Sequence, residues 1–146
     1  MLRQFAAEHE ELRTALGSIR QAADRLALRR SVQALDDVRV AYRFLCDELL
    51  PHERAEDERL YPRLAAPLGS HEATATMSRT HAEIERLIDR IGTHLRLADH
   101  QGLREEQLDD LVATLYGLYA VLLLHFAQEE ENYFTLAPSG DGQGQK

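Results

Sequence analysis

Histidine and glutamate residues recur in this sequence at spacings that suit metal binding. Four of the seven histidines fall on the apolar faces of predicted helices, one in each: His9, His52, His81 and His125. The second and the fourth are each followed four residues later by a glutamate in the next core-facing position, Glu56 and Glu129. Residues four apart lie above one another on a helix face, so each pair can reach one point. A buried carboxylate is costly unless it is paired or binds a metal ion. The pattern therefore predicts a metal site in the protein interior.

The elements that must position these residues are four helices. Apolar residues recur at alternating steps of three and four over about 2–28, 31–65, 72–98 and 104–136, and no stretch alternates with period two. Short connections make sequential helices antiparallel, so the predicted fold class is all-α, an up-down-up-down four-helix bundle. Ser31 and Ser70 are predicted N-caps, and Pro51 is predicted to bend the second helix just before His52.

The predicted depths of the six residues agree. At 1.5 Å per residue, His9 and His81 lie about 10–15 Å after the starts of their helices, and His52 and His125 lie about 18 Å before the ends of theirs. In an antiparallel bundle these positions are at the same end, so all six side chains can converge. The alternative is a metal-free network of hydrogen-bonded histidines and glutamates, which would need six buried groups to be fully satisfied.

The sequence also repeats itself. Leu49–Glu58 aligns with Leu122–Glu131 at an offset of 73, and the residues around His9 align with those around His81 at an offset of 72. The bundle is therefore predicted to consist of two helical hairpins related by an approximate twofold axis.

The ligand types favour a pair of mid-row transition metals. Four imidazoles and two carboxylates suit two ions with two histidines each and bridging carboxylates, with iron favoured over manganese. Structural zinc usually has four ligands, often including cysteine, and magnesium and calcium prefer oxygen ligands. Glu53 and Glu85 are possible additional metal ligands, although each is more readily interpreted as a surface acid.

The remaining polar residues are given simpler interpretations. His94 is about 20 Å along its helix from His81 and cannot share the site. His71 has a possible access or supporting role, while Tyr42, Tyr119 and Cys46 are interpreted as core residues. Four further acids are predicted to form an exposed acidic face: Asp57, Glu58, Glu130 and Glu131.

Composition limits the choice of partners and compartment. The chain has 146 residues, a net charge of −8 and one cysteine. An acidic surface repels phosphate backbones and anionic lipids, so nucleic acid and membrane partners are not expected. The lone Cys46 and the lack of a signal-peptide pattern favour the cytoplasm. We expect one domain, residues 1–137, and a disordered tail, residues 138–146.

The pattern of these motifs resembles the hemerythrin-like (HHE cation-binding) family. It consists of one histidine on each of the first and third helices and of HxxxE on the second and fourth. The segments HERAEDERLYPRL from His52 and HFAQEEENYFTL from His125 are similar to its repeated signature. The resemblance implies iron ligands at the four histidines and two glutamates bridging the irons beneath an oxo or hydroxo group. The classical oxygen carriers of the family have a histidine where this chain has Glu85, and an aspartate five residues after the last histidine, where it has Glu130.

The resemblance implies a non-haem di-iron protein that binds O2, peroxide or nitric oxide as a small ligand. Two alternatives use the same ligands: a di-iron enzyme that decomposes hydrogen peroxide, and an iron-handling or sensory module. The Glu-x-x-His pairs of ferritin-like sites and the HExxH motif of metalloproteases are absent from the sequence. The sequence decides neither whether the protein is an enzyme nor its oligomeric state.

Overall fold

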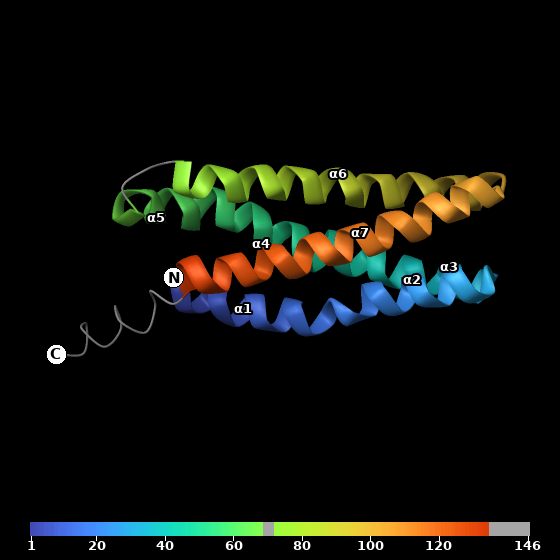
Figure 1. Cartoon of the computed structure of the whole chain (residues 1–146), viewed down its shortest axis with the longest axis horizontal. Helices are drawn as coiled ribbons and strands as arrows, with labels where there is room; N and C mark the ends of the chain where they lie inside the picture. Colours follow the sequence, from blue (N-terminus) through green and yellow to red (C-terminus); the bar gives the residue numbers. More distant parts are fainter. Residues whose placement is uncertain (69–71, 135–146) are drawn as a thin grey trace.

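The computed structural model describes residues 1–68 and 72–134, which form an antiparallel bundle of four helical rods without strands among them (Figure 1). The first rod consists of α1 (Leu2–Ala15) and α2 (Gly17–Arg29). The second contains α3 (Val32–Phe44), η1 (Leu45–Leu49), α4 (Leu50–Ala55), η2 (Glu56–Leu60) and α5 (Tyr61–Leu68). The third is α6 (Glu72–His100), and the fourth joins α7 (Glu105–Glu129) to η3 (Glu130–Phe134). The predicted all-α fold is confirmed.

Local signals in the sequence account for the ends of the rods. Ser31 is the predicted N-cap of α3, and its hydroxyl accepts a hydrogen bond from the Ala34 N–H at 3.2 Å. Gly102 has φ +78° in the turn between α6 and α7, a conformation that favours glycine. Ser70, His71 and the predicted tail, 138–146, lie outside the described residues.

The second rod contains two π-helical turns that the sequence did not predict. Each turn ends two residues before a proline: the Leu50 N–H bonds to the Leu45 carbonyl ahead of Pro51, and the Tyr61 N–H bonds to the Glu56 carbonyl ahead of Pro62. A proline lacks the N–H of a regular helix and its ring crowds the carbonyl four residues back. The wide turns accommodate both effects, so the predicted disruption before His52 takes the form of a π turn.

Two apolar clusters fill the bundle, one on each side of a polar layer. The large cluster includes Leu12, Leu49, Ile84, Leu122 and Phe126 and continues toward the turn that precedes α7. The small cluster contains Phe5, Leu60, Tyr61, Leu64 and Met77. On the first three rods, His9, His52, Glu56 and His81 lie between these clusters along their helices, so apolar side chains flank the polar layer on both sides there.

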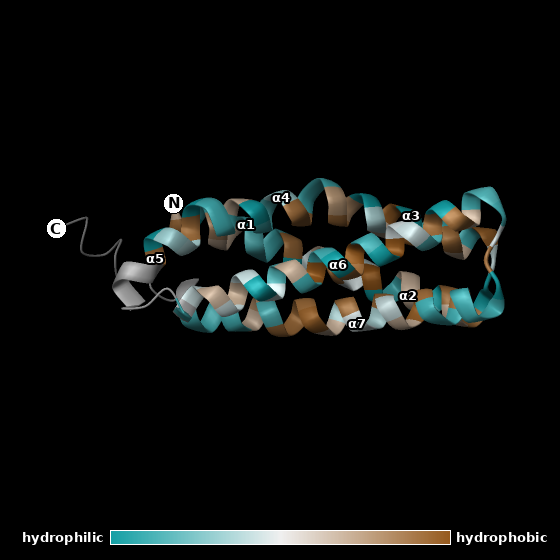
Figure 2. Cartoon of the chain, turned by 90° about the horizontal axis from the view of Figure 1, so that it is seen from above, coloured by the Kyte–Doolittle hydropathy of each residue, from teal (hydrophilic) through white to brown (hydrophobic). Residues whose placement is uncertain are grey.

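Helix α7 is the most apolar of the four rods, and Figure 2 shows hydrophobic residues along much of its length. Its continuous helical span, Glu105–Asn132, is long and apolar enough to cross a membrane by length and composition, which the sequence analysis did not expect. The same test is passed by core helices, and α7 contributes Leu111, Leu115, Leu118 and Leu122 to the large cluster. Burial in the bundle thus explains part of its hydrophobicity.

Candidate metal centre

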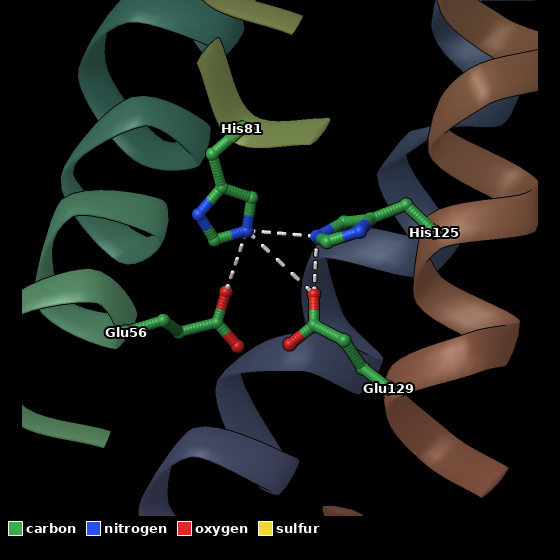
Figure 3. A group of neighbouring side chains, drawn as sticks. All are labelled: Glu56, His81, His125 and Glu129. Carbon is green, nitrogen blue, oxygen red and sulfur yellow. Dashed lines mark hydrogen bonds and ion pairs between the residues drawn. The ribbon is translucent and has the colours of Figure 1, made fainter. Parts of the chain in front are cut away.

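The six predicted ligands converge in one buried layer. α1 supplies His9, α4 supplies His52, η2 begins with Glu56, α6 supplies His81, and α7 supplies His125 and Glu129. All six are buried, and both glutamates are 0% exposed. Figure 3 shows side chains from three of the rods pointing toward one another: Glu56, His81, His125 and Glu129. The ligand atoms of these four lie within 4.8 Å of one another.

The histidines form two pairs. In the first pair, His81 Nε2 lies 2.7 Å from His125 Nε2. In the second, the ring centroids of His9 and His52 are 6.0 Å apart. Each pair combines one histidine from a HxxxE segment with one lone histidine, which gives two neighbouring positions with two imidazoles each.

Each glutamate lies between the two histidine pairs. Glu56 Oε1 is 3.4 Å from His81 Nε2, and Glu56 Oε2 is 3.4 Å from His52 Nε2. Glu129 Oε1 forms a short contact with His125 Nε2 and lies 4.0 Å from His9 Nε2. Each carboxylate is therefore within reach of imidazoles from both histidine pairs.

Three of the four imidazoles are oriented from outside by a carboxylate. The Nδ1 atoms of His52, His81 and His9 lie 3.0 Å from Glu8, 3.2 Å from Asp57 and 3.4 Å from Glu130, respectively. A carboxylate only accepts hydrogen bonds, so the Nδ1 atoms of His52 and His81 carry the proton and donate it, while His9 Nδ1 lies at ion-pair distance from Glu130. This arrangement turns Nε2 toward the centre and raises its basicity as a ligand.

Two of these carboxylates, Asp57 and Glu130, were predicted to belong to an exposed acidic face, and this prediction is wrong. Asp57 and Glu130 are half-buried and are themselves held, Asp57 by the Ser78 hydroxyl at 2.8 Å and Glu130 by Arg13 at 2.7 Å. Glu58 and Glu131 are exposed, as predicted. The helical period places Asp57 and Glu130 at the edge of the apolar face, and only packing shows which histidine each one meets.

The two possible additional metal ligands, Glu53 and Glu85, differ in burial. Glu53 is 2% exposed, so its interpretation as a surface acid is wrong; neither of its oxygens has a hydrogen-bond partner among the described residues. Glu85 is 49% exposed and pairs with Arg54 at 3.5 Å, so it does not join the cluster. Both line a cavity of about 120 Å³ that also borders Asp57 and His81.

Tyr61 was missed by the sequence analysis. Its hydroxyl lies 3.2 Å from His81 Nε2, and its ring stacks on the His81 ring with centroids 5.4 Å apart. The π turn at η2 inserts an extra residue, so both Leu60 and Tyr61 face the core. A strict three-four period assigns that position to Leu60 alone, and only the following Pro62 hinted at the irregular turn.

The other polar residues lie apart from the centre. His94 Nε2 donates a hydrogen bond to Asp110, 2.7 Å away on α7, and takes no part in the cluster, as predicted. Tyr42 and Tyr119 are partly buried against the large cluster. Cys46 is half-buried there, so its thiol is less enclosed than predicted.

Burial and close charges shift the pKa values of the centre strongly. Burial raises the pKa of Glu53 to about 8, and burial together with Glu129 raises the pKa of Glu56 to about 7. Burial opposes the charged form of His81, but Asp57, Glu129 and Glu56 outweigh it and raise the pKa to about 12. At neutral pH, a metal ion would therefore compete with protons for these buried carboxyl and imidazole groups.

The donor set fits transition-metal binding. Among the described residues, both oxygens of Glu56, both of Glu129 and His52 Nε2 are buried and, apart from their close contacts with one another and the neighbouring imidazoles, have no regular hydrogen bond. Buried polar atoms normally have hydrogen-bond partners, so a concentration of five such atoms in one layer indicates a missing ligand. Imidazole nitrogens mixed with carboxylate oxygens are the ligands that iron and manganese accept.

Comparison with known proteins agrees with this geometry. The family model described as the hemerythrin HHE cation binding domain matches residues 1–137. The chain belongs to the hemerythrin HHE cation-binding domain family. No curated protein and no solved structure matches the chain. A cation site is therefore expected of this HHE domain from its family, and the His/Glu group described above is where its fold can hold metal.

Proposed function

We propose that this HHE domain is a non-haem di-iron protein whose centre binds O2, peroxide or nitric oxide. The observation that supports this most strongly is the position of Glu56 and Glu129, each within reach of both histidine pairs. Two bridging carboxylates with two imidazoles on each side match the needs of two iron ions, with manganese as the second choice. When bound, the irons supply a redox centre for a small ligand.

Glu53 is proposed as the seventh ligand. Its carboxylate is buried without a hydrogen-bond partner among the described residues and borders the same small cavity as His81. The centre has four imidazoles and two bridging carboxylates, and a terminal carboxylate on the His81 side would add one oxygen ligand there. The cavity of about 120 Å³ beside Glu53 is large enough for a diatomic ligand or peroxide and provides access from the surface.

Decomposition of hydrogen peroxide is the second candidate function. The observation that favours it is the Tyr61 hydroxyl, 3.2 Å from His81 Nε2, together with polar groups of Glu53, Asp57 and Ser78 around the small cavity. Cleaving an O–O bond requires proton donors close to the reacting oxygens. The Tyr61 hydroxyl beside the centre can supply a proton, whereas simple reversible O2 binding does not need one. A cytoplasmic location and the absence of nucleic acid and membrane partners remain part of the proposal.

Metal analysis of the purified chain tests the proposal. After anaerobic reconstitution with Fe²⁺ and removal of excess ion, we expect about two irons per chain. The variant His81→Ala should lose at least half of this iron, whereas His100→Ala, which changes an exposed histidine outside the centre, should retain it. A reconstituted protein with no bound iron or manganese would refute the centre.

The same preparations distinguish the two functions. Absorbance that changes with O2 and reverses on degassing would support ligand binding. Catalytic release of O2 from hydrogen peroxide by the iron-loaded chain, lost in His81→Ala and retained in His100→Ala, would support the enzyme.

A further inference from the structure

Among the described residues, His125 lacks the carboxylate partner at Nδ1 that the other three histidines of the centre have. The Nδ1 atoms of His9, His52 and His81 each face an acid from a neighbouring rod. His125 Nδ1 is fully buried and has no hydrogen-bond partner among the described residues. When Nε2 binds a metal ion, Nδ1 carries the ring proton and needs an acceptor. One of four otherwise similar ligands is thus left incomplete.

The internal repeat shows which residue is missing. The repeat relates His9 to His81, His52 to His125 and Asp57 to Glu130, and the contacts between Asp57 and His81 and between Glu130 and His9 correspond. The contact between Glu8 and His52 has no counterpart, because position 80 holds Thr80 where the first half holds Glu8. The Thr80 hydroxyl donates to the Thr76 carbonyl at 3.0 Å within its own helix. The second half therefore lacks one carboxylate.

A cavity lies where that carboxylate would stand. It has a volume of about 390 Å³ between α6 and α7, and its walls include His125, Thr80, Arg79 and Gln128. The equivalent groove in the first half contains Glu8 and His52. The cavity thus offers a guanidinium, a hydroxyl and an amide beside the incomplete histidine.

The rest of the wall defines the size and polarity of a ligand. Val121 and Leu124 give the cavity an apolar side. Glu83 also lines it, but Arg86 binds this acid at 3.0 Å and offsets its charge. Arg79 therefore remains as a cation facing a space with one apolar wall, which suits an anion with a short hydrocarbon tail.

We propose that this cavity binds a short-chain aliphatic carboxylate, which takes the place of the missing acidic side chain. One carboxylate oxygen accepts the hydrogen bond from His125 Nδ1, Arg79 balances its charge, and the tail packs against Val121 and Leu124. The inference rests on the proposed metal centre, because metal on Nε2 fixes the proton on Nδ1. Metal and carboxylate then strengthen each other's binding by the same factor.

Butyrate is the probe, with the neutral butyramide as its control. The Fe²⁺ affinity of the full chain is measured anaerobically by competition with a chelator, at constant ionic strength. Partners of this kind typically change metal affinity by about 10- to 100-fold, so we expect butyrate to tighten Fe²⁺ binding by about 10-fold. Butyramide should leave the affinity unchanged.

Two variants locate the effect. Thr80→Glu supplies the carboxylate from the chain itself, so it should tighten Fe²⁺ binding without butyrate and abolish the response to it. Arg79→Gln, at an exposed position, should lose the butyrate response while retaining the basal affinity. Arg96→Gln, at an exposed position far along the same helix from the cavity, should respond like the wild type.

Several results would overturn the inference. A response that persists in Thr80→Glu and Arg79→Gln would place butyrate directly on the metal, and an equal effect of butyramide would exclude an anion site. About two irons per chain without a butyrate response would refute the carboxylate site alone, whereas a chain without metal would refute the centre on which it rests. Arg79→Gln keeps the test decisive if Thr80→Glu fails to fold.

Discussion

Replacement of the buried Glu53 by glutamine should stabilise the metal-free protein and weaken the metal-loaded one. The pKa of Glu53 rises from 4.5 to about 8 because the side chain is buried. A carboxyl group with a raised pKa contributes stability that is fully present below the unfolded pKa and is lost as the pH rises through the folded pKa. The metal-free wild type should therefore lose stability between pH 4.5 and about 8.

The size of the effect follows from the shift. Within this window the free energy of unfolding falls by about 1.4 kcal/mol per pH unit for one proton. It is therefore about 3 kcal/mol lower at pH 7 than at pH 4.5. Glutamine has nearly the same shape and no titrating proton. Glu53→Gln should therefore match the wild type near pH 4.5 and exceed its free energy of unfolding by up to about 3 kcal/mol at pH 7.

Urea denaturation followed by far-ultraviolet circular dichroism measures this difference at several pH values, without metal and with Fe²⁺ under anaerobic conditions. With Fe²⁺ the order should reverse, because the wild type keeps the carboxylate that we propose as a metal ligand and the variant lacks it. Glu58→Gln, which changes an exposed acid on the same rod, is the matched control and should follow the wild type. Equal pH dependence of Glu53→Gln and wild type without metal would refute the reasoning.

Three further outcomes follow from the contacts of the centre and the core. Asp57→Asn removes the charge that orients His81 and should weaken Fe²⁺ binding by about 10- to 100-fold in chelator competition, with an unchanged affinity arguing against that role. Tyr61→Phe should retain the iron but slow any peroxide decomposition measured as O2 release; an unaltered rate would exclude the hydroxyl as a proton donor. Gly92→Ala should lower the free energy of unfolding by about 1–3 kcal/mol, because its new Cβ would lie 2.5 Å from the Tyr42 hydroxyl oxygen. Unchanged stability in urea denaturation would show that the Tyr42 ring moves freely.

The sequence by itself determined the rods and the layer of ligands. Apolar residues at steps of three and four define one buried face on each helix, and the fixed rise per residue sets the depth of every position on it. His9, His52, His81 and His125 therefore had to meet once the helices were antiparallel. The same regularity placed His94 too far along α6 to join them, and it pairs with Asp110 instead.

Only the tertiary structure decided which groups surround that layer. Tyr61 faces the interior because the π turn at η2 departs from the regular period on which the sequence argument depends, and only packing shows that Glu53 is buried. Glu8, Asp57 and Glu130 meet histidines on other rods, and the rotation of one rod against its neighbour is a result of side-chain packing that no single helix encodes. The spacing of residues along the sequence thus fixes their positions along the helix axes. The packing of side chains between the rods fixes which neighbours each residue contacts.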